Sequence, residues 1–243
     1  MLNIVIAELV KLKRTFILWV GALMTIAMPF LTFLSNTERE ITFSYFAQSS
    51  LSLSVLLLFP CLFSLIITFV YSREHQEDTM KSLMCIPISR YKLAAAKFMV
   101  ISLYFSAILI LHAFLSLVIA ILFGCDGITV QSFIEILFLN VRVMPPYIVT
   151  VLPIIGIVII TRKSYVIPLG VGIIITIANI VVIQSRFAAI YPWTAVMRFC
   201  GDMQGMLNII YFDLSVWVSI ISLFVCFILG LIMIISSLSK QEY

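Results

Sequence analysis

The chain has 243 residues, of which 63% are hydrophobic and 11% are charged. An ordinary soluble domain carries about a quarter of its residues as charged side chains, so this composition excludes one and indicates an integral membrane protein. The formal net charge of +4 is small, and in a membrane protein it reflects orientation rather than a nucleic-acid partner.

Six stretches contain no Asp, Glu, Lys or Arg and approach or exceed the ~20 residues that an α-helix needs to cross a bilayer. They are residues 15–37, 41–72, 98–125, 143–161, 164–185 and 214–239. Each stretch is continuously apolar rather than alternating, which favours helices over the strands of a membrane barrel. We therefore predict an all-α integral membrane protein, with six transmembrane helices in one domain over residues 1–243.

The basic residues predict the orientation, since Lys and Arg accumulate in cytoplasmic loops close to the ends of spans. With both termini in the cytoplasm, eleven basic residues lie inside and four lie outside. Those inside are Lys11, Lys13, Arg14, Arg73, Lys81, Arg90, Lys92, Lys97, Arg162, Lys163 and Lys240, and those outside are Arg39, Arg142, Arg186 and Arg198. This excess predicts a multi-pass protein with cytoplasmic termini.

Residues 1–14 are too polar to span the bilayer, yet their apolar side chains recur at helical spacing. Leu2, Val5, Ile6, Leu9 and Leu12 share one face of a helix. This pattern is typical of an amphipathic helix that lies in the plane of the membrane. The alternative is a charged flank that only orients the first span.

The stretch YSREHQEDTMKSLMCIPISRYKLAAAK, residues 71–97, follows the second predicted span and holds eight charged residues. Asp78 is expected to cap a short helix over residues 79–84, because its carboxylate accepts hydrogen bonds from the first turn. Pro87 then ends this helix. The cytoplasmic segment 72–93, with apolar Leu83 and Met84, suits docking into a groove on a soluble partner. An ordinary positive-inside loop would explain its basic residues but not its acidic ones.

The outer segment 186–213 is long, aromatic and interrupted by Pro192. It admits two short re-entrant helices, and a loop on the membrane surface is the alternative. Tyr191 and Trp193, with Trp217 just beyond the segment, suit a membrane interface. These three aromatic residues are candidate substrate-binding residues.

His112 lies in the middle of the third predicted span, where it is a titratable exception among uncharged residues. It is a fourth candidate substrate-binding residue if it lines a pathway. Alternatively, it is a neutral side chain that is hydrogen-bonded to another helix. Prolines within the spans, including Pro60 and Pro153, mark either hinges or static packing.

Several kinds of chemistry have no motif in this chain. No Gly is followed by Lys, so the phosphate loop that binds a nucleotide triphosphate is missing. The two histidines form no H-E-x-x-H site, and the spans hold no paired carboxylates or nucleophile–base set. We therefore expect no catalytic residue, metal or cofactor in this chain. Cys125 and Cys200 are the cysteines that can meet outside, and their pairing stays open.

The charged stretch also carries a motif. Its residues follow the pattern E…T…L…P-[IV]-S-R…K with Glu74, Thr79, Leu83, Pro87, Ser89-Arg90 and Lys97. In this pattern, in its size and in its basic N-terminal helix, the chain resembles ABC type-two exporter permeases. Within them it is most similar to the permease subunits of lantibiotic-immunity and bacitracin-resistance transporters of Gram-positive bacteria. Asp78 departs from the pattern, because many relatives have Gly there.

The resemblance implies the permease subunit of an ABC exporter in a bacterial cell membrane. Two permease subunits, identical or related, would pair with a separate cytoplasmic ATPase subunit that binds ATP and Mg. The segment 72–93 would be the coupling helix, and the residues implied for coupling are Glu74, Asp78, Thr79, Leu83, Met84, Pro87 and Arg90. The implied cargo is a membrane-active antimicrobial peptide, lantibiotic or bacitracin-like, whose expulsion gives immunity or resistance.

A second hypothesis is a non-transporting membrane sensor or scaffold that signals to a cytoplasmic partner through the same segment. Partner binding without substrate-stimulated ATP turnover would favour it. A membrane-embedded enzyme is a third hypothesis, for which the spans offer no nucleophile–base set.

Overall fold

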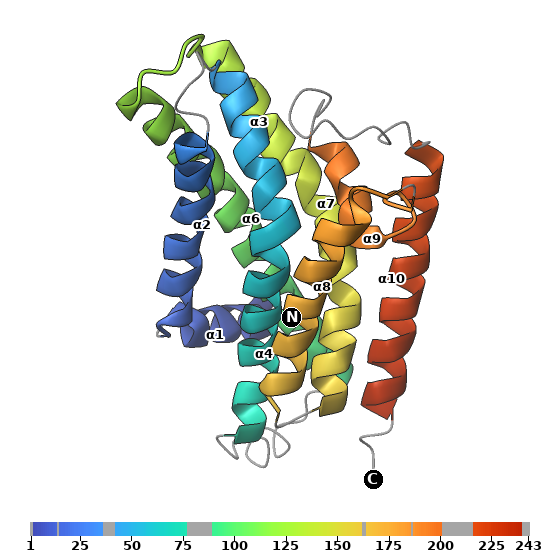
Figure 1. Ribbon diagram of the computed structural model, residues 1–243. Coiled ribbons are helices and arrows are strands. Elements are labelled where there is room, and N and C mark those ends of the chain that lie inside the picture. The colour runs from blue at the N-terminus through green and yellow to red at the C-terminus, as the bar shows by residue number, and fades with distance from the viewer. Residues whose placement is uncertain are drawn as a thin grey trace.

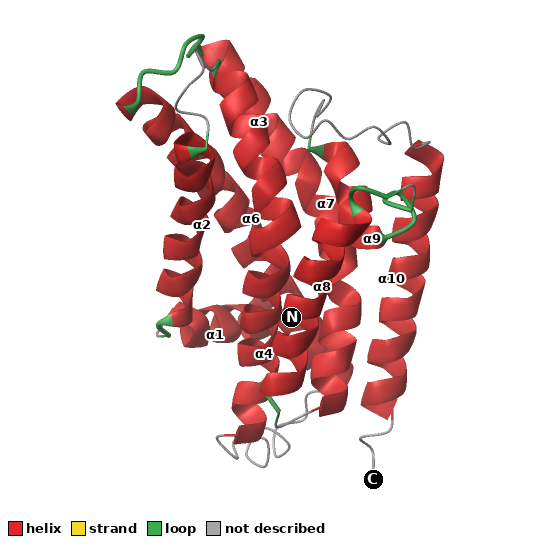
Figure 2. Cartoon of the chain, in the orientation of Figure 1, coloured by secondary structure: helices red, strands yellow, loops and turns green. Residues whose placement is uncertain are grey.

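The computed structural model describes residues 2–13, 15–35, 42–76, 89–161, 164–185, 187–200 and 216–239, and their regular structure is helical throughout (Figures 1 and 2). The elements are α1 (Leu2–Lys13), α2 (Ile17–Leu34), α3 (Phe43–Leu53), the π-helical η1 (Ser54–Leu58), α4 (Phe59–Gln76), α6 (Arg90–Leu122), α7 (Val130–Thr161), α8 (Val166–Val182), α9 (Pro192–Ala195), the 3₁₀-helical η2 (Val196–Phe199) and α10 (Val216–Ser239). The predicted all-α class is confirmed for this part of the chain.

Five helical stretches in the described ranges are long and apolar enough to cross a bilayer, so the chain is a multi-pass membrane protein. They are Ile17–Leu34, Phe43–Arg73, Tyr91–Leu122, Val130–Thr161 and Val216–Ser239. The apolar helix α8 has 17 residues and is therefore about 25 Å long, slightly short of the ~30 Å hydrocarbon core. The predicted count of six spans depends on α8 and stays a prediction.

The helices α6 and α7 begin before the predicted spans 98–125 and 143–161. In each case polar residues cap the helix upstream of the apolar stretch. Ser89 caps α6 by accepting from the backbone N–H of Lys92 at 3.4 Å. Before α7, the backbone N–H groups of Thr129 and Ser132 each donate to the other residue's hydroxyl, at 2.9 and 3.1 Å. As a result α7 includes Glu135 and Arg142, which the sequence analysis placed in an outer connection.

The turn between α6 and α7 is built on Gly124, whose φ of 70° is in the left-handed region that favours glycine. The backbone N–H of Cys125 donates to the Ala120 carbonyl, and that of Gly124 donates to the Ile121 carbonyl. This pair of bonds is a Schellman motif, which satisfies the last carbonyls of α6. The start of α3 is held at the same turn, because the N–H of Phe43 donates to the Asp126 carbonyl at 2.8 Å.

The main core lies where α4, α6 and α7 meet. Phe59 and Phe63 of α4 pack against Phe105 of α6 and Tyr147 of α7, and the four rings are at most 2% exposed. The Phe63 and Phe105 centroids are 4.5 Å apart in an edge-to-face contact, a geometry that adds about 1 kcal/mol beyond area burial. This aromatic cluster fixes the relative positions of the three helices.

The helix α10 packs closely along α7, and small residues permit the approach. A Cβ at Gly230 would lie 2.5 Å from the Cβ of Leu152, and a Cβ at Gly156 would lie 2.7 Å from the Cβ of Met233. Small residues at helix contacts let backbones approach in a membrane, where packing replaces the hydrophobic effect as the driving force. Figure 1 shows α2 and α10 at opposite sides of the bundle, with α4 and α8 between them.

The helix α1 lies crosswise to α2 and α4 in Figure 1 and contacts α6. Its Leu12 is buried in the main core, whereas Leu2 is 74% exposed. The predicted helix over residues 1–14 is thus present as Leu2–Lys13. Its position in the plane of a membrane stays a prediction.

Candidate functional site

The predicted coupling residues flank or fall in the part of the chain between α4 and α6. Asp78, Thr79, Leu83, Met84 and Pro87 lie outside the described residues, so their role stays a prediction. Glu74 and Arg90 belong to the backbones of α4 and α6, while their side chains also lie outside the description. The described structure therefore bears on this segment through the two helix ends that flank it.

Near these two ends, Lys97 of α6 forms a hydrogen bond to α4. Its side chain is 3% exposed, and Nζ donates to the carbonyl of Val70 at 3.0 Å. The same ammonium group lies 5.3 Å from the ring centroid of Tyr71, within cation–π range. In the opposite direction, the Tyr71 hydroxyl donates to the carbonyl of Ala94 at 3.0 Å. Two side-chain-to-backbone bonds thus cross-link the C-terminal part of α4 to the N-terminal part of α6.

The helix α1 adds a charged pair near this link. Glu8 is only 7% exposed and its carboxylate accepts from Lys11 Nζ at 2.6 Å. It also lies within electrostatic range of the Tyr71 hydroxyl. We refer to Glu8, Lys11, Val70, Tyr71, Ala94 and Lys97 as the Lys97 junction. The junction brings together residues of α1, α4 and α6.

The second span is interrupted in its middle by the π-helical segment η1, and Pro60 supplies a physical reason. Proline has no N–H, so the carbonyl of Leu56, four residues earlier, loses its usual helical donor. Asn179 of α8 replaces that donor, with Nδ2 2.8 Å from the Leu56 oxygen. Thr176, one turn earlier, places its hydroxyl 3.4 Å from the Leu57 carbonyl. Asn179 therefore satisfies the Leu56 carbonyl of η1, while the Thr176 hydroxyl is shared with the Gly172 carbonyl at 3.0 Å.

Close approach of α8 to α4 makes these contacts possible. A Cβ at Gly172 would collide with Ser64 and would lie 3.1 Å from the Pro60 carbonyl oxygen. Only glycine permits this spacing, one turn from Thr176 and two turns from Asn179. We refer to Gly172, Thr176 and Asn179 as the α8 clamp.

His112 reaches η1 from α6. Its side chain is completely buried, and Nε2 lies 3.2 Å from Ser54 Oγ and 3.5 Å from Ser50 Oγ. Asn140 of α7 is also completely buried, and its Nδ2 donates to the Ile136 carbonyl at 2.9 Å. The hydrogen bonds to another helix therefore match the second of the two expectations for His112. Contact with cargo stays a prediction, and in this structure no surface of His112 is exposed to make it.

The outer aromatic candidates separate into two groups. Tyr191 and Trp193 contact each other with ring centroids 5.3 Å apart, at the start of α9. Trp217 lies apart on the first turn of α10 and is 74% exposed. The segment 187–200 packs into the protein, since Val196 and Met197 are completely buried. Whether residues 186–213 form re-entrant helices or a loop on the membrane surface stays a prediction, and residues 201–213 of this segment lie outside the description.

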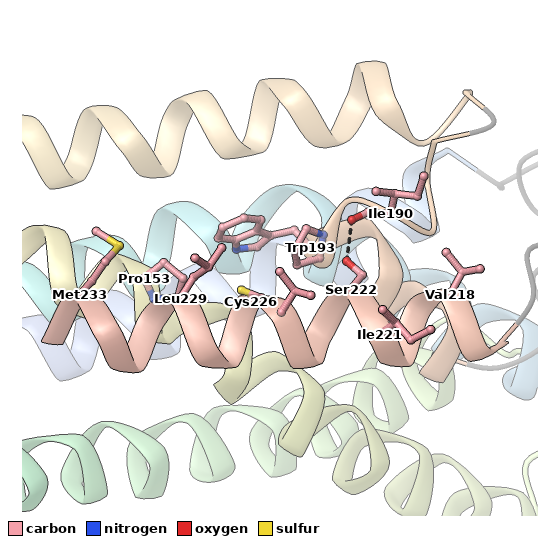
Figure 3. A pocket seen from close by; sticks show the side chains of 11 residues that line it. Pro153, Ile190, Trp193, Val218, Ile221, Ser222, Cys226, Leu229 and Met233 are labelled. Atoms are coloured by element: carbon pink, nitrogen blue, oxygen red, sulfur yellow. Dashed lines mark hydrogen bonds between the residues drawn. The ribbon is translucent and has the colours of Figure 1, made fainter. Parts of the chain in front are cut away.

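Trp193 also lines a pocket between α7, α9 and α10, with a volume of about 560 Å³ (Figure 3). Its other lining residues are mostly aliphatic and include Pro153, Ile190, Ser222, Cys226 and Leu229. The hydroxyl of Ser222 donates to the Ile190 carbonyl, whereas the indole N–H of Trp193 is buried without a hydrogen-bond partner among the described residues. Tyr191 and Trp217 are not among the lining residues.

The two outer cysteines are free thiols in the structure. Burial raises the pKa of the Cys125 thiol, and the nearby Asp126 carboxylate raises it further. A raised pKa keeps the thiol protonated and so lowers its reactivity toward oxidation and exchange. Pairing of Cys125 with Cys200 is therefore not part of this conformation.

Sequence reasoning missed the α8 clamp and the tie made by Lys97. A signal for the first exists in the chain, because Pro60 predicts a carbonyl in need of a donor and Asn179 is a polar residue in an apolar helix. Lys97 was singled out only as part of a motif. No pattern along one helix predicts that its partner is the Val70 carbonyl on another.

Two comparisons with known proteins bear on this architecture. A family model described as "ABC-2 family transporter protein" matches residues 4–179, which is most of the chain. A bacitracin transport permease protein, BCRB of Bacillus licheniformis, is 27% identical over 163 residues, covering 62% of this chain and 72% of that protein. The matched region of the family model includes the Lys97 junction and the α8 clamp.

Proposed function

Because the chain belongs to the ABC-2 transporter family, we propose that it is the permease subunit of an ABC exporter that removes a membrane-active antimicrobial peptide. A separate ATPase subunit, holding ATP and Mg, supplies the energy. A second permease subunit, identical or related, completes the translocation path. The relative named as a bacitracin transport permease favours bacitracin or a lantibiotic as cargo.

The observation that carries this proposal is the Lys97 junction. Residues 77–88 connect α4 to α6, and Lys97 and Tyr71 bond these two helices to each other beside that connection. A force applied to the connection is then transmitted to both helices together. This is what a coupling segment needs, because an ATPase subunit can move the spans only through a mechanically continuous contact.

In the proposed topology, residues 77–88 and both termini face the cytoplasm and α8 is the sixth span. The coupling residues are Glu74, Asp78, Thr79, Leu83, Met84, Pro87 and Arg90. The helix α1 lies in the membrane plane on the same side, where Glu8 contributes to the Lys97 junction. Movement of the coupling segment is therefore felt first by α1, α4 and α6.

The test is reconstitution of the chain with the ABC ATPase that co-purifies with it from native membranes. We expect ATP turnover to rise with added bacitracin or lantibiotic, and to lose that response in Leu83→Asp. Leu83→Met is the matched control, because it keeps an apolar side chain of similar volume. Leu83→Asp turnover that responds like the wild type would contradict the coupling assignment.

The same assay separates the exporter from a sensor or scaffold. An exporter shows peptide-stimulated turnover and moves labelled peptide out of the vesicle membrane. A sensor binds the ATPase and the peptide but moves no peptide. Release of labelled peptide from the bilayer is therefore measured beside ATP turnover.

A further inference from the structure

The pocket lined by Trp193 lies along α10, which contacts the rest of the bundle at two places near it. Toward its C-terminus α10 is fixed to α7 at Gly230, where a Cβ would lie 2.5 Å from Leu152. Toward its N-terminus α10 contacts the turn before α9, where the hydroxyl of Ser222 donates to the Ile190 carbonyl. The pocket of about 560 Å³ extends along α10 past both contacts, since Val218 and Met233 also line it.

One face of α10 forms the outer wall of this pocket and is also accessible from the surroundings. Ile221, Val225 and Leu229 all line the pocket, and their exposed fractions are 61%, 49% and 54%. Figure 3 shows Ile221 and Leu229 along one helix, with Trp193 and Pro153 behind it. Since α10 is a candidate span, the medium that reaches this face is the hydrocarbon of the bilayer.

The size and chemistry of the pocket select among the molecules that a membrane can offer. One turn of an α-helix with its side chains fills about 400–600 Å³, so the pocket accommodates at most one turn and does not fit a helix of a partner protein. An extended peptide would bring backbone N–H and C=O groups into an aliphatic wall, where each unpaired group costs several kcal/mol. A hydrocarbon chain carries no such groups and gains contact with every lining residue.

We propose that this pocket binds one acyl chain of a membrane phospholipid, which lies between α10, α9 and Pro153 of α7. The volume falls within the range of about 300–1,000 Å³ for ligand sites. The proposal is independent of the exporter assignment and of its cargo.

The test uses the fluorescence of Trp193 in the full-length chain. The other two tryptophans, Trp19 and Trp217, are 67% and 74% exposed and are replaced by Phe. The protein is placed in phosphatidylglycerol vesicles with brominated acyl chains and, separately, in unbrominated ones. Bromine quenches tryptophan only at contact range, so we expect marked quenching of Trp193 in the brominated vesicles.

Two variants fill the pocket and one does not. Val225→Phe and Leu229→Phe place a ring in the pocket and should abolish most of the quenching. Ile228→Phe is the matched control, because Ile228 is on the same helix and 41% exposed but does not line the pocket. A protein that keeps only Trp217 should be quenched in every variant, which verifies that the chain is inserted and folded.

Absence of Trp193 quenching would overturn the proposal, and would mean that protein rather than lipid covers the pocket. Equal quenching in the filled variants and in Ile228→Phe would also overturn it, because the chain would then contact Trp193 by another route. Loss of quenching in Val225→Phe and Leu229→Phe alone supports it.

Discussion

At the residue scale, Lys97 stands out because its charged side chain is only 3% exposed. A charged group taken out of water is costly unless it is paired or hydrogen-bonded. Its bond to the Val70 carbonyl and its position over the Tyr71 ring offset that cost. The same contacts connect α6 to α4 beside residues 77–88, so the residue is positioned to serve coupling.

The first prediction concerns this bond. Lys97→Met keeps much of the side-chain length but leaves the Val70 carbonyl without its Nζ donor. We expect basal ATP turnover of the reconstituted complex to persist, while peptide stimulation falls about five-fold or more, equivalent to about 1 kcal/mol of coupling. Lys92→Met is the matched control, since Lys92 is exposed on the same helix. Equal stimulation in both variants would remove Lys97 from the coupling route.

Part of the residue-level picture could be predicted from the sequence. A lone His112 in an apolar span already indicated either a pathway or an interhelical hydrogen bond, and its distance of 3.2 Å to Ser54 matches the bond. The identity of the partner could not be predicted, because hydrophobic periodicity describes one helix at a time. The hydrogen-bonding residues Ser50 and Ser54 come from α3 and η1, not from the helix of His112.

At the element scale, the π-helical interruption of the second span follows from Pro60, which has no backbone N–H to donate. The π-helical turn lacks some of the regular α-helical hydrogen bonds. Asn179 of the α8 clamp donates to the Leu56 carbonyl in place of a backbone N–H. Such segments are frequent at functional sites. Here the interruption lies between the Lys97 junction at one end of α4 and the aromatic segment around Trp193, which contacts η1 through α9.

The second prediction tests the α8 clamp. Asn179→Leu keeps the volume but leaves the buried Leu56 carbonyl unsatisfied, which should cost about 1–3 kcal/mol of stability. Thermal unfolding of the purified chain in detergent measures the change. Ile180→Leu, at an exposed position on the same helix, should leave the transition where it is. An unchanged transition in Asn179→Leu would show that the Leu56 carbonyl finds another donor.

The third prediction tests the contact between α7 and α10. Gly230→Ala adds a methyl group 2.5 Å from the Leu152 Cβ, so the helices must separate, and we expect a loss of about 1–3 kcal/mol. Gly170→Ala is the control, because no atom lies within 4 Å of its added Cβ. Thermal unfolding compares the two variants. Similar transitions would mean that α10 is free to shift along α7.

At the scale of the whole molecule, composition alone predicted a helical membrane protein, because apolar runs of span length have few other stable forms in lipid. The packing order of the helices could not be predicted from the sequence. It depends on contacts between segments far apart in the chain, such as Gly172 against Ser64. The length of α7 was underestimated for a local reason. The cap formed by Thr129 and Ser132 starts α7 at Val130, so the helix includes the polar residues that precede the apolar stretch 143–161.

The last prediction decides whether α8 crosses the membrane. Single cysteines are introduced into a chain whose native cysteines are Ser, at Gln131, Ser164 and Ser185. If α8 is a span, Ser164→Cys is protected from a membrane-impermeant maleimide in intact cells, while Gln131→Cys and Ser185→Cys react, because α7 and α8 each change the side of the membrane. Permeabilised cells should label all three, which controls for accessibility. Protection of both Ser164→Cys and Ser185→Cys would leave the chain with five spans and its termini on opposite sides.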